Sequence, residues 1–193
     1  MDQDQATVAL LADRDVAPRL THWLRQRSAT AAGYEVVDVS EMAGRGLLPR
    51  PARTLISYFP DPDQTREVIS PLLEARVLPA GAVWLQLGPM ELPRAYGFAM
   101  QARAAELQLW HAPYLQTPDP LADEPPMAVV WGPISVTSRG RVDGLVRALT
   151  SQAAWCGPLE NALETPTAFS HEAGFEGLAD AALTRLDPPP PRE

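Results

Sequence analysis

The sequence predicts an α/β protein with a mostly parallel β-sheet and helices on both faces. Apolar segments of strand length alternate with amphipathic segments of helix length over about residues 7 to 158, and glycine or proline separates most of them. Such alternation is typical of parallel sheets whose strands are buried on both faces. With 193 residues and 46% apolar side chains, the chain can form one domain with a substantial core.

The first strand, turn and helix have the pattern with which a nucleotide-binding βαβ unit begins. An apolar run over residues 8–12 leads into a polar turn and then into an amphipathic helix. The apolar side chains of that helix recur at helical spacing: Val16, Leu20, Trp23 and Leu24. A GxGxxG turn would have glycines where this chain has Ala12, Arg14 and Ala17. The strand, turn and helix of a nucleotide-binding unit are therefore expected, but the glycines that would bind a phosphate are missing.

The remaining elements follow from the same periodicities. Further strands are expected at residues 33–39, 53–59, 83–87, 107–111, 127–131 and 153–156, and helices at 64–75, 93–105, 141–151 and 172–186. Asp63 is the expected N-cap of the helix that follows it. Residues 42–51 form a loop, and residues 117–126, with four prolines and three acids, form an irregular excursion or lid.

These elements divide the chain into three parts. Residues 1–158 are the expected α/β domain, residues 159–187 a short helical extension, and residues 188–193 a disordered proline-rich tail.

Composition excludes several function classes. The formal net charge is −8 and the arginines form no stripe, so nucleic acid is not an expected partner. The acidic N-terminus lacks the features of a signal peptide and no apolar run approaches the length of a membrane span, which favours a cytoplasmic location. All sixteen basic residues are arginine, and the lack of lysine excludes Schiff-base chemistry.

The metal-ligating residue types are few. Cys156 is the single cysteine, which excludes an internal disulfide and a multi-cysteine zinc site, and we expect it to be buried in a strand. His22, His111 and His171 are the histidines, and their spacing does not indicate a metal site. His22 is expected to face solvent on the first helix.

Three segments together resemble one known family. Residues 52–61 (ARTLISYFPD) are similar to the strand and turn ADVVISMLPD, residues 78–86 (LPAGAVWLQ) to LKPGAVVVD, and residues 111–113 (HAP) to DAP. These motifs occur in the same order in the N-terminal NAD(P)-binding domain of the β-hydroxyacid dehydrogenase and imine reductase superfamily. That superfamily includes 3-hydroxyisobutyrate and 6-phosphogluconate dehydrogenases. The resemblance implies a Rossmann-type fold for residues 7 to 158.

The chain departs from this family at the functional positions. In the family, the first turn wraps the cofactor pyrophosphate, whereas here Arg14 is flanked by Asp13 and Asp15. An Asp15 carboxylate that caps the first helix would occupy the N–H groups a phosphate needs. The family's substrate-binding DxST segment is QLGP at residues 86–89. Its catalytic lysine has no counterpart, and we expect the helical second domain to be absent, so hydride transfer by this chain alone is not expected.

Three functional hypotheses follow. The first is a degenerate Rossmann-type protein that needs no cofactor and serves as a non-redox scaffold or as a regulatory or assembly subunit. The second is a cofactor-independent cyclase or isomerase that acts on a small molecule in the former cofactor cleft. Its candidate catalytic residues lie at or near strand ends: His111, Tyr114, Tyr58 and Asp61. The alternative for His111, Tyr58 and Phe59 is a purely structural role.

The third hypothesis is a subunit of a split reductase that retains NAD or NADP. Its candidate cofactor-binding residues are Arg14, Ser40, Phe59 and Pro60. Arg14 would hold a phosphate and Ser40 the ribose or a 2′-phosphate, whereas the neighbouring Glu41 would repel a 2′-phosphate.

Tryptophan usage favours association. Four of the five tryptophans fall in or at the end of expected strands: Trp84, Trp110, Trp131 and Trp155. They indicate more apolar surface than one sheet domain needs. We therefore expect a homodimer or a contact with a protein partner.

Overall fold

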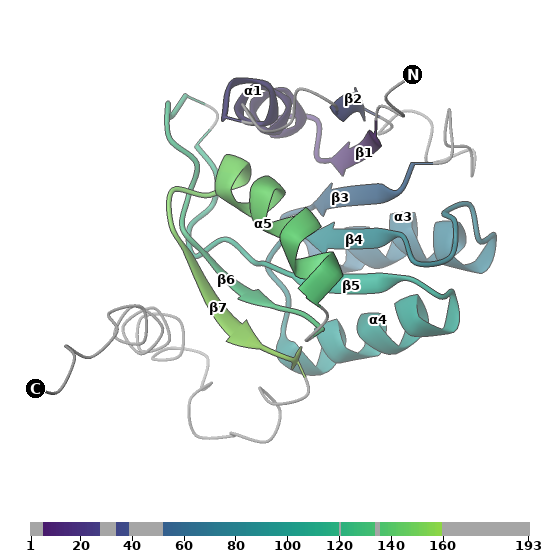
Figure 1. Cartoon of the computed structure of the whole chain (residues 1–193). Coiled ribbons are helices and arrows are strands. Elements are labelled where there is room, and N and C mark those ends of the chain that lie inside the picture. The colour runs from purple at the N-terminus through teal and green to yellow at the C-terminus, as the bar shows by residue number, and fades with distance from the viewer. Residues whose placement is uncertain (1–5, 28–33, 39–51, 120, 134–135, 160–193) are drawn as a thin grey trace, which may run out of the picture.

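The computed structural model describes residues 6–27, 34–38, 52–119, 121–133 and 136–159. Seven strands form a single sheet: β1 (Ala6–Ala12), β2 (Tyr34–Asp38), β3 (Thr54–Tyr58), β4 (Val83–Gln86), β5 (Gln108–His111), β6 (Ala128–Trp131) and β7 (Ala153–Gly157). Within these residues, four helices cover it: α1 (Ala17–Arg27), α3 (Pro62–Glu74), α4 (Leu92–Ala104) and α5 (Val136–Leu149). Figure 1 shows this arrangement, which confirms the predicted Rossmann-type α/β fold.

The strand order is β2-β1-β3-β4-β5-β6-β7. Every neighbouring pair is parallel except β5 and β6, so β6 and β7 run opposite to the first five strands. The chain moves from β1 to β2 on one side and returns to β3 on the other side of β1. The topological switch point therefore lies between β1 and β3, and open α/β sheets bind ligands at the carboxyl ends of the strands beside such a point.

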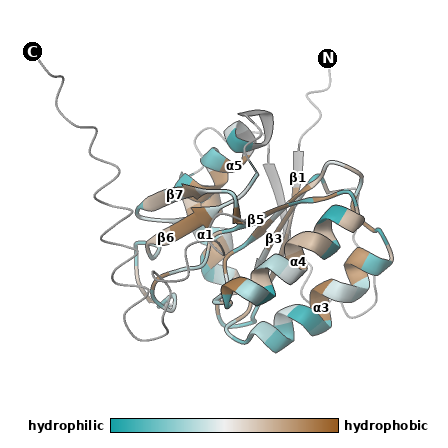
Figure 2. Cartoon of the chain, turned by 90° about the horizontal axis from the view of Figure 1, so that it is seen from below, coloured by the Kyte–Doolittle hydropathy of each residue, from teal (hydrophilic) through white to brown (hydrophobic). Residues whose placement is uncertain are grey.

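Two apolar layers enclose the sheet. One layer packs α1 and α5 on one face, and the other packs α3 and α4 on the opposite face (Figure 2). Because side chains alternate along a strand, a strand such as β4 contributes to both layers, with Trp84 in one and Leu85 in the other. All four tryptophans that were expected in strands lie there, and Trp84 is fully buried. The apolar face of α1 is buried as predicted: Val16, Leu20, Trp23 and Leu24.

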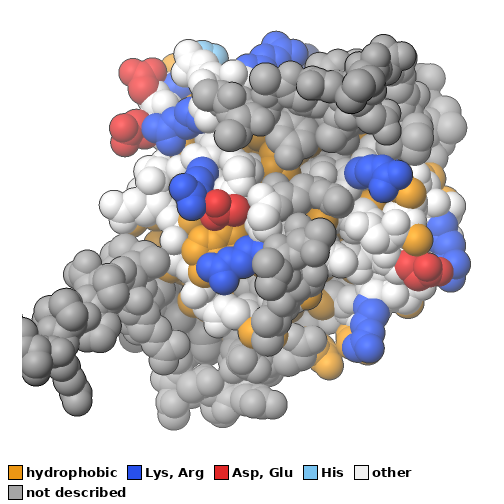
Figure 3. Space-filling model, in the orientation of Figure 1, with side chains coloured by type: hydrophobic (Ala, Val, Ile, Leu, Met, Phe, Trp, Pro, Cys, Tyr) orange, Lys and Arg blue, Asp and Glu red, His pale blue; other side chains and the backbone are white. Residues whose placement is uncertain are grey.

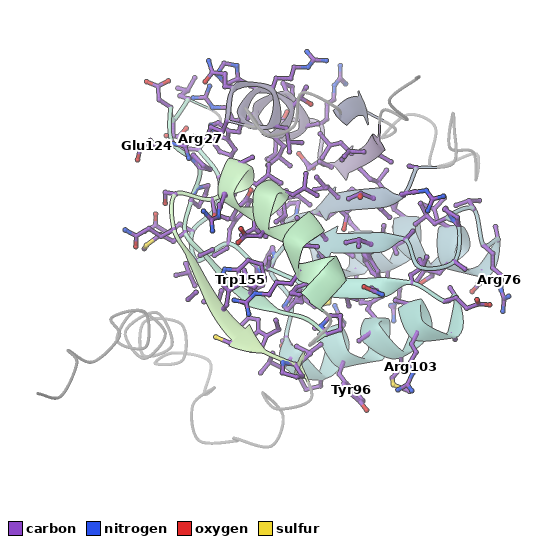
Figure 4. All side chains as sticks on the ribbon, viewed as in Figure 1. Arg27, Arg76, Tyr96, Arg103, Glu124 and Trp155 are labelled. Carbon is purple, nitrogen blue, oxygen red and sulfur yellow. The ribbon has the colours of Figure 1, made fainter. Side chains whose placement is uncertain are left out.

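The excursion between β5 and β6 contains no helix or strand in its described residues, as predicted. It is held against α1 by three contacts. The Trp23 indole N–H donates to the carbonyl of Asp123 at 3.2 Å, and the Arg19 guanidinium lies 3.6 Å from the Asp123 carboxylate. Arg27 and Glu124 form an ion pair at 4.0 Å and lie together at the edge of the molecule (Figure 4).

Two helix boundaries differ from the sequence predictions. Helix α5 begins at Val136 and not at residue 141, although Gly140 and Gly144 lower its intrinsic helix propensity. Buried residues of this helix such as Val142 and Leu149 pack on the sheet, and this tertiary packing outweighs the glycines.

Helix α3 begins at Pro62, and its N-cap is Asp61 rather than Asp63. The Asp61 carboxylate accepts a hydrogen bond from the Asp63 N–H at 2.8 Å, while Pro62 occupies the first helical position, where no N–H is needed.

Two smaller predictions concern exposure. Cys156 lies in β7 as expected, but it is half-buried rather than buried. His22 is exposed, as expected.

Several predicted features lie outside the described residues. These are the residues Ser40, Glu41 and His171, the loop 42–51, the helix 172–186 and the tail 188–193. Among the helices in the described ranges, none is long and apolar enough to cross a membrane. Within the same part of the chain, no group of three or more His, Cys, Asp or Glu side chains could hold a metal ion.

Candidate functional site

The turn between β1 and α1 lies at the switch point, and Asp13 closes it from within. The Asp13 carbonyl accepts hydrogen bonds from the N–H groups of Val16 at 3.0 Å and Ala17 at 2.9 Å. Its carboxylate accepts the N–H of Asp15 at 3.0 Å. The expectation that Asp15 caps the helix was therefore wrong: an Asp side chain reaches the N–H two residues further on, and Asp13 occupies that position.

The neighbouring backbone donors of this turn are also in use. The Asp13 N–H donates to the carbonyl of Tyr58 at 2.9 Å, and the N–H groups of Arg19 and Leu20 donate to Val16. Pro18 has no N–H. Over residues 13–20, the Arg14 N–H is then the single backbone donor for which the described residues provide no acceptor. The turn lacks the group of free N–H donors with which a Rossmann fold holds a pyrophosphate.

Tyr58 and Tyr114 lie together on the α1/α5 face of the sheet. Their ring centroids are 5.8 Å apart and their planes are tilted by 43°. The Tyr114 hydroxyl donates to the carbonyl of Leu149, at the end of α5, at 2.8 Å. Burial raises the pKa of Tyr114 well above its ordinary value, and Tyr58 adds to this effect. Burial and then the Asp13 carboxylate raise the pKa of Tyr58. Both hydroxyls therefore stay protonated at neutral pH.

His111 lies on the opposite, α3/α4, face of the sheet. It ends β5 three residues before Tyr114, and an odd spacing in an extended chain places two side chains on opposite faces. Its ring stacks on Trp131 with centroids 5.8 Å apart and planes inclined by 22°. Burial lowers the pKa of His111 to about 4, although the nearby backbone of Met90 acts in the opposite direction. The ring is therefore neutral at physiological pH and is separated from the tyrosine pair.

A row of buried polar side chains crosses three strands beside His111. Ser57 of β3, Gln86 of β4 and His111 of β5 are register partners. The Trp84 indole N–H donates to Ser57 Oγ at 2.7 Å, and the Ser57 hydroxyl donates to Gln86 Oε1. Of these three residues, His111 was among the candidates predicted from the sequence, whereas Ser57 was not. The available signal was a polar residue at or next to the end of each of three otherwise apolar strands.

The other candidate residues are dispersed along the same edge. Asp61 is exposed and serves as the N-cap of α3. Phe59 is buried in the α3/α4 layer, and Pro60 and Arg14 are exposed. Tyr58 and Phe59 are thus both core residues, each in a different layer. Of the four catalytic candidates, the structure brings together Tyr58 and Tyr114, and neither His111 nor Asp61 joins them.

The two loops that follow β3 and β4 pack tightly against each other. A Cβ on Gly88 would lie 2.4 Å from the carbonyl oxygen of Phe59, so glycine is required for this close approach. Nearby on the surface, the Asp63 carboxylate lies 3.3 Å from both Arg66 and Arg94. Arginine and acidic side chains are interspersed on the face shown in Figure 3.

Comparisons place this geometry among known folds. No family model and no curated protein sequence matches the chain. Among solved structures, an imine reductase from Myxococcus stipitatus in complex with NADP+ matches with 14% identity and a TM-score of 0.58, over 93% of this chain and 61% of that chain. The 3-hydroxyisobutyrate dehydrogenase of Mycobacterium tuberculosis matches with 14% identity and a TM-score of 0.62, over 94% of this chain and 60% of that one.

An imine reductase from Aspergillus terreus in complex with NADPH4 and dibenz[c,e]azepine matches with 14% identity and a TM-score of 0.57, over 95% of this chain and 62% of the enzyme. The chain thus spans 60% to 62% of the length of these three enzymes. Its Rossmann-type fold is the one found in imine reductases and 3-hydroxyisobutyrate dehydrogenases, as its strand and turn motifs led us to expect.

Proposed function

We propose that this chain is a non-redox subunit that uses a dehydrogenase-type Rossmann domain as a scaffold, in a regulatory or assembly role. The β1–α1 turn carries the proposal. In a nucleotide-binding domain this turn offers its N–H groups to a pyrophosphate. Here Asp13 accepts three of those N–H groups, through its carbonyl and its carboxylate. NAD(P) therefore does not fit this turn in the usual way.

Electrostatics support the same conclusion. Asp13 and Asp15 place two carboxylates at the N-terminal end of α1, where a pyrophosphate would otherwise be favoured by the helix dipole. These carboxylates would repel a phosphate, which carries the same sign of charge. Arg14 lies between them in the sequence, but its side chain is exposed to solvent, where screening weakens its attraction for phosphate. The charges at this turn therefore disfavour binding of a dinucleotide, even if the Arg14 side chain contacts its phosphates.

Calorimetric titration with NADH and NADPH tests the cofactor part of the proposal. NADPH is included because an imine reductase with this fold was solved with NADP+. We expect no binding heat at millimolar nucleotide. A dissociation constant below about 100 μM, equivalent to about −5.5 kcal/mol, would contradict the proposal and favour an NAD(P)-binding subunit of a split reductase. In that case Arg14→Ala should abolish binding. Arg76→Ala should not, because Arg76 follows the end of α3 and is not part of the β1–α1 turn.

The scaffold part of the proposal requires a protein partner, and a second copy of the chain is the first candidate. Among the residues that the structure describes, two large apolar side chains are exposed, Leu121 at 87% and Met100 at 48%. They lie on the excursion and on α4, respectively. Light scattering after size-exclusion chromatography would measure the mass of the assembly. A monomer at every concentration, together with no protein partner after affinity purification from the native host, would contradict the scaffold role.

A cofactor-independent enzyme is the second candidate, and the tyrosine pair favours it. Tyr58 and Tyr114 are neutral acids beside the switch point, and the Asp13 carboxylate lies near Tyr58. Proton transfer to a small metabolite, as in a cyclisation or isomerisation, needs such a group near the sheet edge. Tyr58→Phe keeps the ring and removes the hydroxyl. Accumulation of a pathway intermediate in cells carrying this variant would favour the enzyme over the scaffold, and unchanged metabolites would count against it.

A further inference from the structure

The polar row beneath the β4 turn leaves hydrogen-bonding groups without partners. Gln86 Nε2 and both ring nitrogens of His111 are buried and make no hydrogen bond of ordinary geometry. The exposed fraction is 0% for Gln86 and 1% for His111. Each buried polar group that lacks a partner costs about 1–3 kcal/mol. Three such atoms on two neighbouring side chains indicate a missing binding partner rather than three separate defects.

The orientation of Gln86 follows from its neighbours. The Trp84 indole is a donor only, so Ser57 Oγ accepts its proton at 2.7 Å. The Ser57 hydroxyl must then donate elsewhere, and it donates to Gln86 Oε1. This chain fixes the amide with its oxygen toward β3 and leaves the two N–H donors of Nε2 unused.

Gln86 and His111 belong to one site. They are register partners on the adjacent parallel strands β4 and β5, so their side chains lie on the same face of the sheet. The turn after β4 covers both of them. A Cβ on Gly88 would lie 3.1 Å from Gln86 Nε2, and the backbone of Met90 lies near the ring of His111. A direct Gln86–His111 bond would use one N–H of Gln86 Nε2 and one ring nitrogen, and the backbone of Met90 lies near the ring, but the second N–H of Nε2 would still lack an acceptor, so the site needs a further group.

The chemistry of the missing partner is constrained by charge. His111 is neutral at physiological pH, and the hydrogen-bonded members of the row carry no charge. A carboxylate or phosphate would be buried there without a counter-charge, at a large cost. The site offers N–H donors from Gln86 and, from neutral His111, one donor and one acceptor. A hydroxyl group matches this set because it accepts and donates at the same oxygen.

We propose that Gln86 and His111 form a binding site for one neutral hydroxyl group, enclosed beneath the turn of residues 87–90. The hydroxyl belongs to a water molecule or to a small ligand that enters at the carboxyl edge of the sheet. In either case its oxygen accepts a hydrogen bond from Gln86 Nε2 and pairs with a ring nitrogen of His111. The site lies on the face of the sheet opposite to α1.

Two measurements on the 193-residue chain separate the two sources. With 15N-labelled protein at neutral pH, a rotating-frame Overhauser cross-peak between water and the Gln86 side-chain amide, of sign opposite to chemical exchange, identifies a bound water. A mass above that of the chain in native mass spectrometry, lost on denaturation, identifies a ligand. If neither is found, or if the Gln86 amide shows a scalar coupling directly to a His111 nitrogen without any water signal, the proposal is wrong.

Matched variants test which residues form the site. Gln86→Met removes the Nε2 donors with little change in side-chain length. Gln108→Met is the matched control: Gln108 begins β5, at the end opposite to His111, and its Oε1 is also buried without a partner. In both variants the water signal is therefore followed at the His111 ring, and we expect this signal, or the excess ligand mass, to disappear in the first variant and to persist in the second. If Gln86→Met does not fold, Gln86→Leu also removes the Nε2 donors and introduces no charge into the buried site. Persistence of the signal in a folded Gln86 variant would overturn the assignment.

Discussion

Replacement of His111 by phenylalanine should remove a large part of the acid sensitivity of this fold. Burial lowers the pKa of His111 to about 4, against about 6.5 for an exposed histidine. Between these two values the unfolded chain binds a proton that the folded chain does not. Stability therefore falls as the pH falls through about 6.5, and the loss is complete only below the folded pKa of about 4. Phenylalanine has no titrating group and preserves the stacking on Trp131.

The size of this effect follows from the two pKa values. Linkage between a folded pKa of about 4 and an unfolded pKa of 6.5 gives a loss of about 2 kcal/mol between pH 7.5 and pH 5, and about 3 kcal/mol by pH 4. The measurement at pH 5 is preferable because most carboxylates still remain ionised there. For a chain of 193 residues, 2 kcal/mol corresponds to a shift in Tm of roughly 4–8 °C.

Urea denaturation followed by tryptophan fluorescence measures this quantity. The informative value is the difference between wild type and His111→Phe at each pH, because other titrating groups contribute equally to both proteins. His22→Gln is the matched control, since His22 is exposed on α1 and its replacement should leave the pH dependence unchanged. If wild type and His111→Phe lose stability in parallel between pH 7.5 and pH 5, His111 is not buried in its neutral form and the reasoning fails.

Three further predictions, each based on one or two substitutions, test the packing around the candidate site. Tyr114→Phe removes the buried hydrogen bond to the end of α5 and should cost about 1–3 kcal/mol in urea denaturation, whereas Tyr58→Phe should cost clearly less; equal losses would contradict this. Gly132→Ala places a Cβ 2.1 Å from an atom of an indole ring and should cost about 3 kcal/mol, while Gly144→Ala, with open space in α5, should stabilise by up to about 1 kcal/mol. Asp13→Ala removes the turn's carboxylate and should lower the pKa of Tyr58, measured by ultraviolet titration of tyrosinate; an unchanged value would place the carboxylate elsewhere.

The sheet and its helices could be predicted from the sequence because burial imposes a period on them. The strand TLISY at residues 54–58 and the buried face of α1 follow directly from that period. The reversal of β6 was not predicted, although a signal existed. A parallel pair needs a crossover, usually a helix, and residues 112–127 contain prolines where that helix would be.

The candidate site was predictable only in part, because its details depend on hydrogen bonds between strands. The sequence placed His111 and Tyr114 at one sheet edge, and their spacing of three residues already implied opposite faces. The sequence did not distinguish Asp13 from Asp15 as the residue that closes the first turn, because both are aspartates close to the start of the helix. The row formed by Ser57, Gln86 and His111 depends on the register of three strands, which periodicity alone does not determine.

Asp13 closes the first turn of this Rossmann-type domain, and we propose that the turn does not hold a dinucleotide. The most direct measurement follows the backbone amide signals of residues 13–20 in a 15N-labelled sample as NADPH is added. We predict that the Val16 and Ala17 signals stay in place, because their N–H groups remain bonded to the Asp13 carbonyl. Saturable shifts confined to these residues, lost in Arg14→Ala, would contradict the account and restore this turn as a cofactor site.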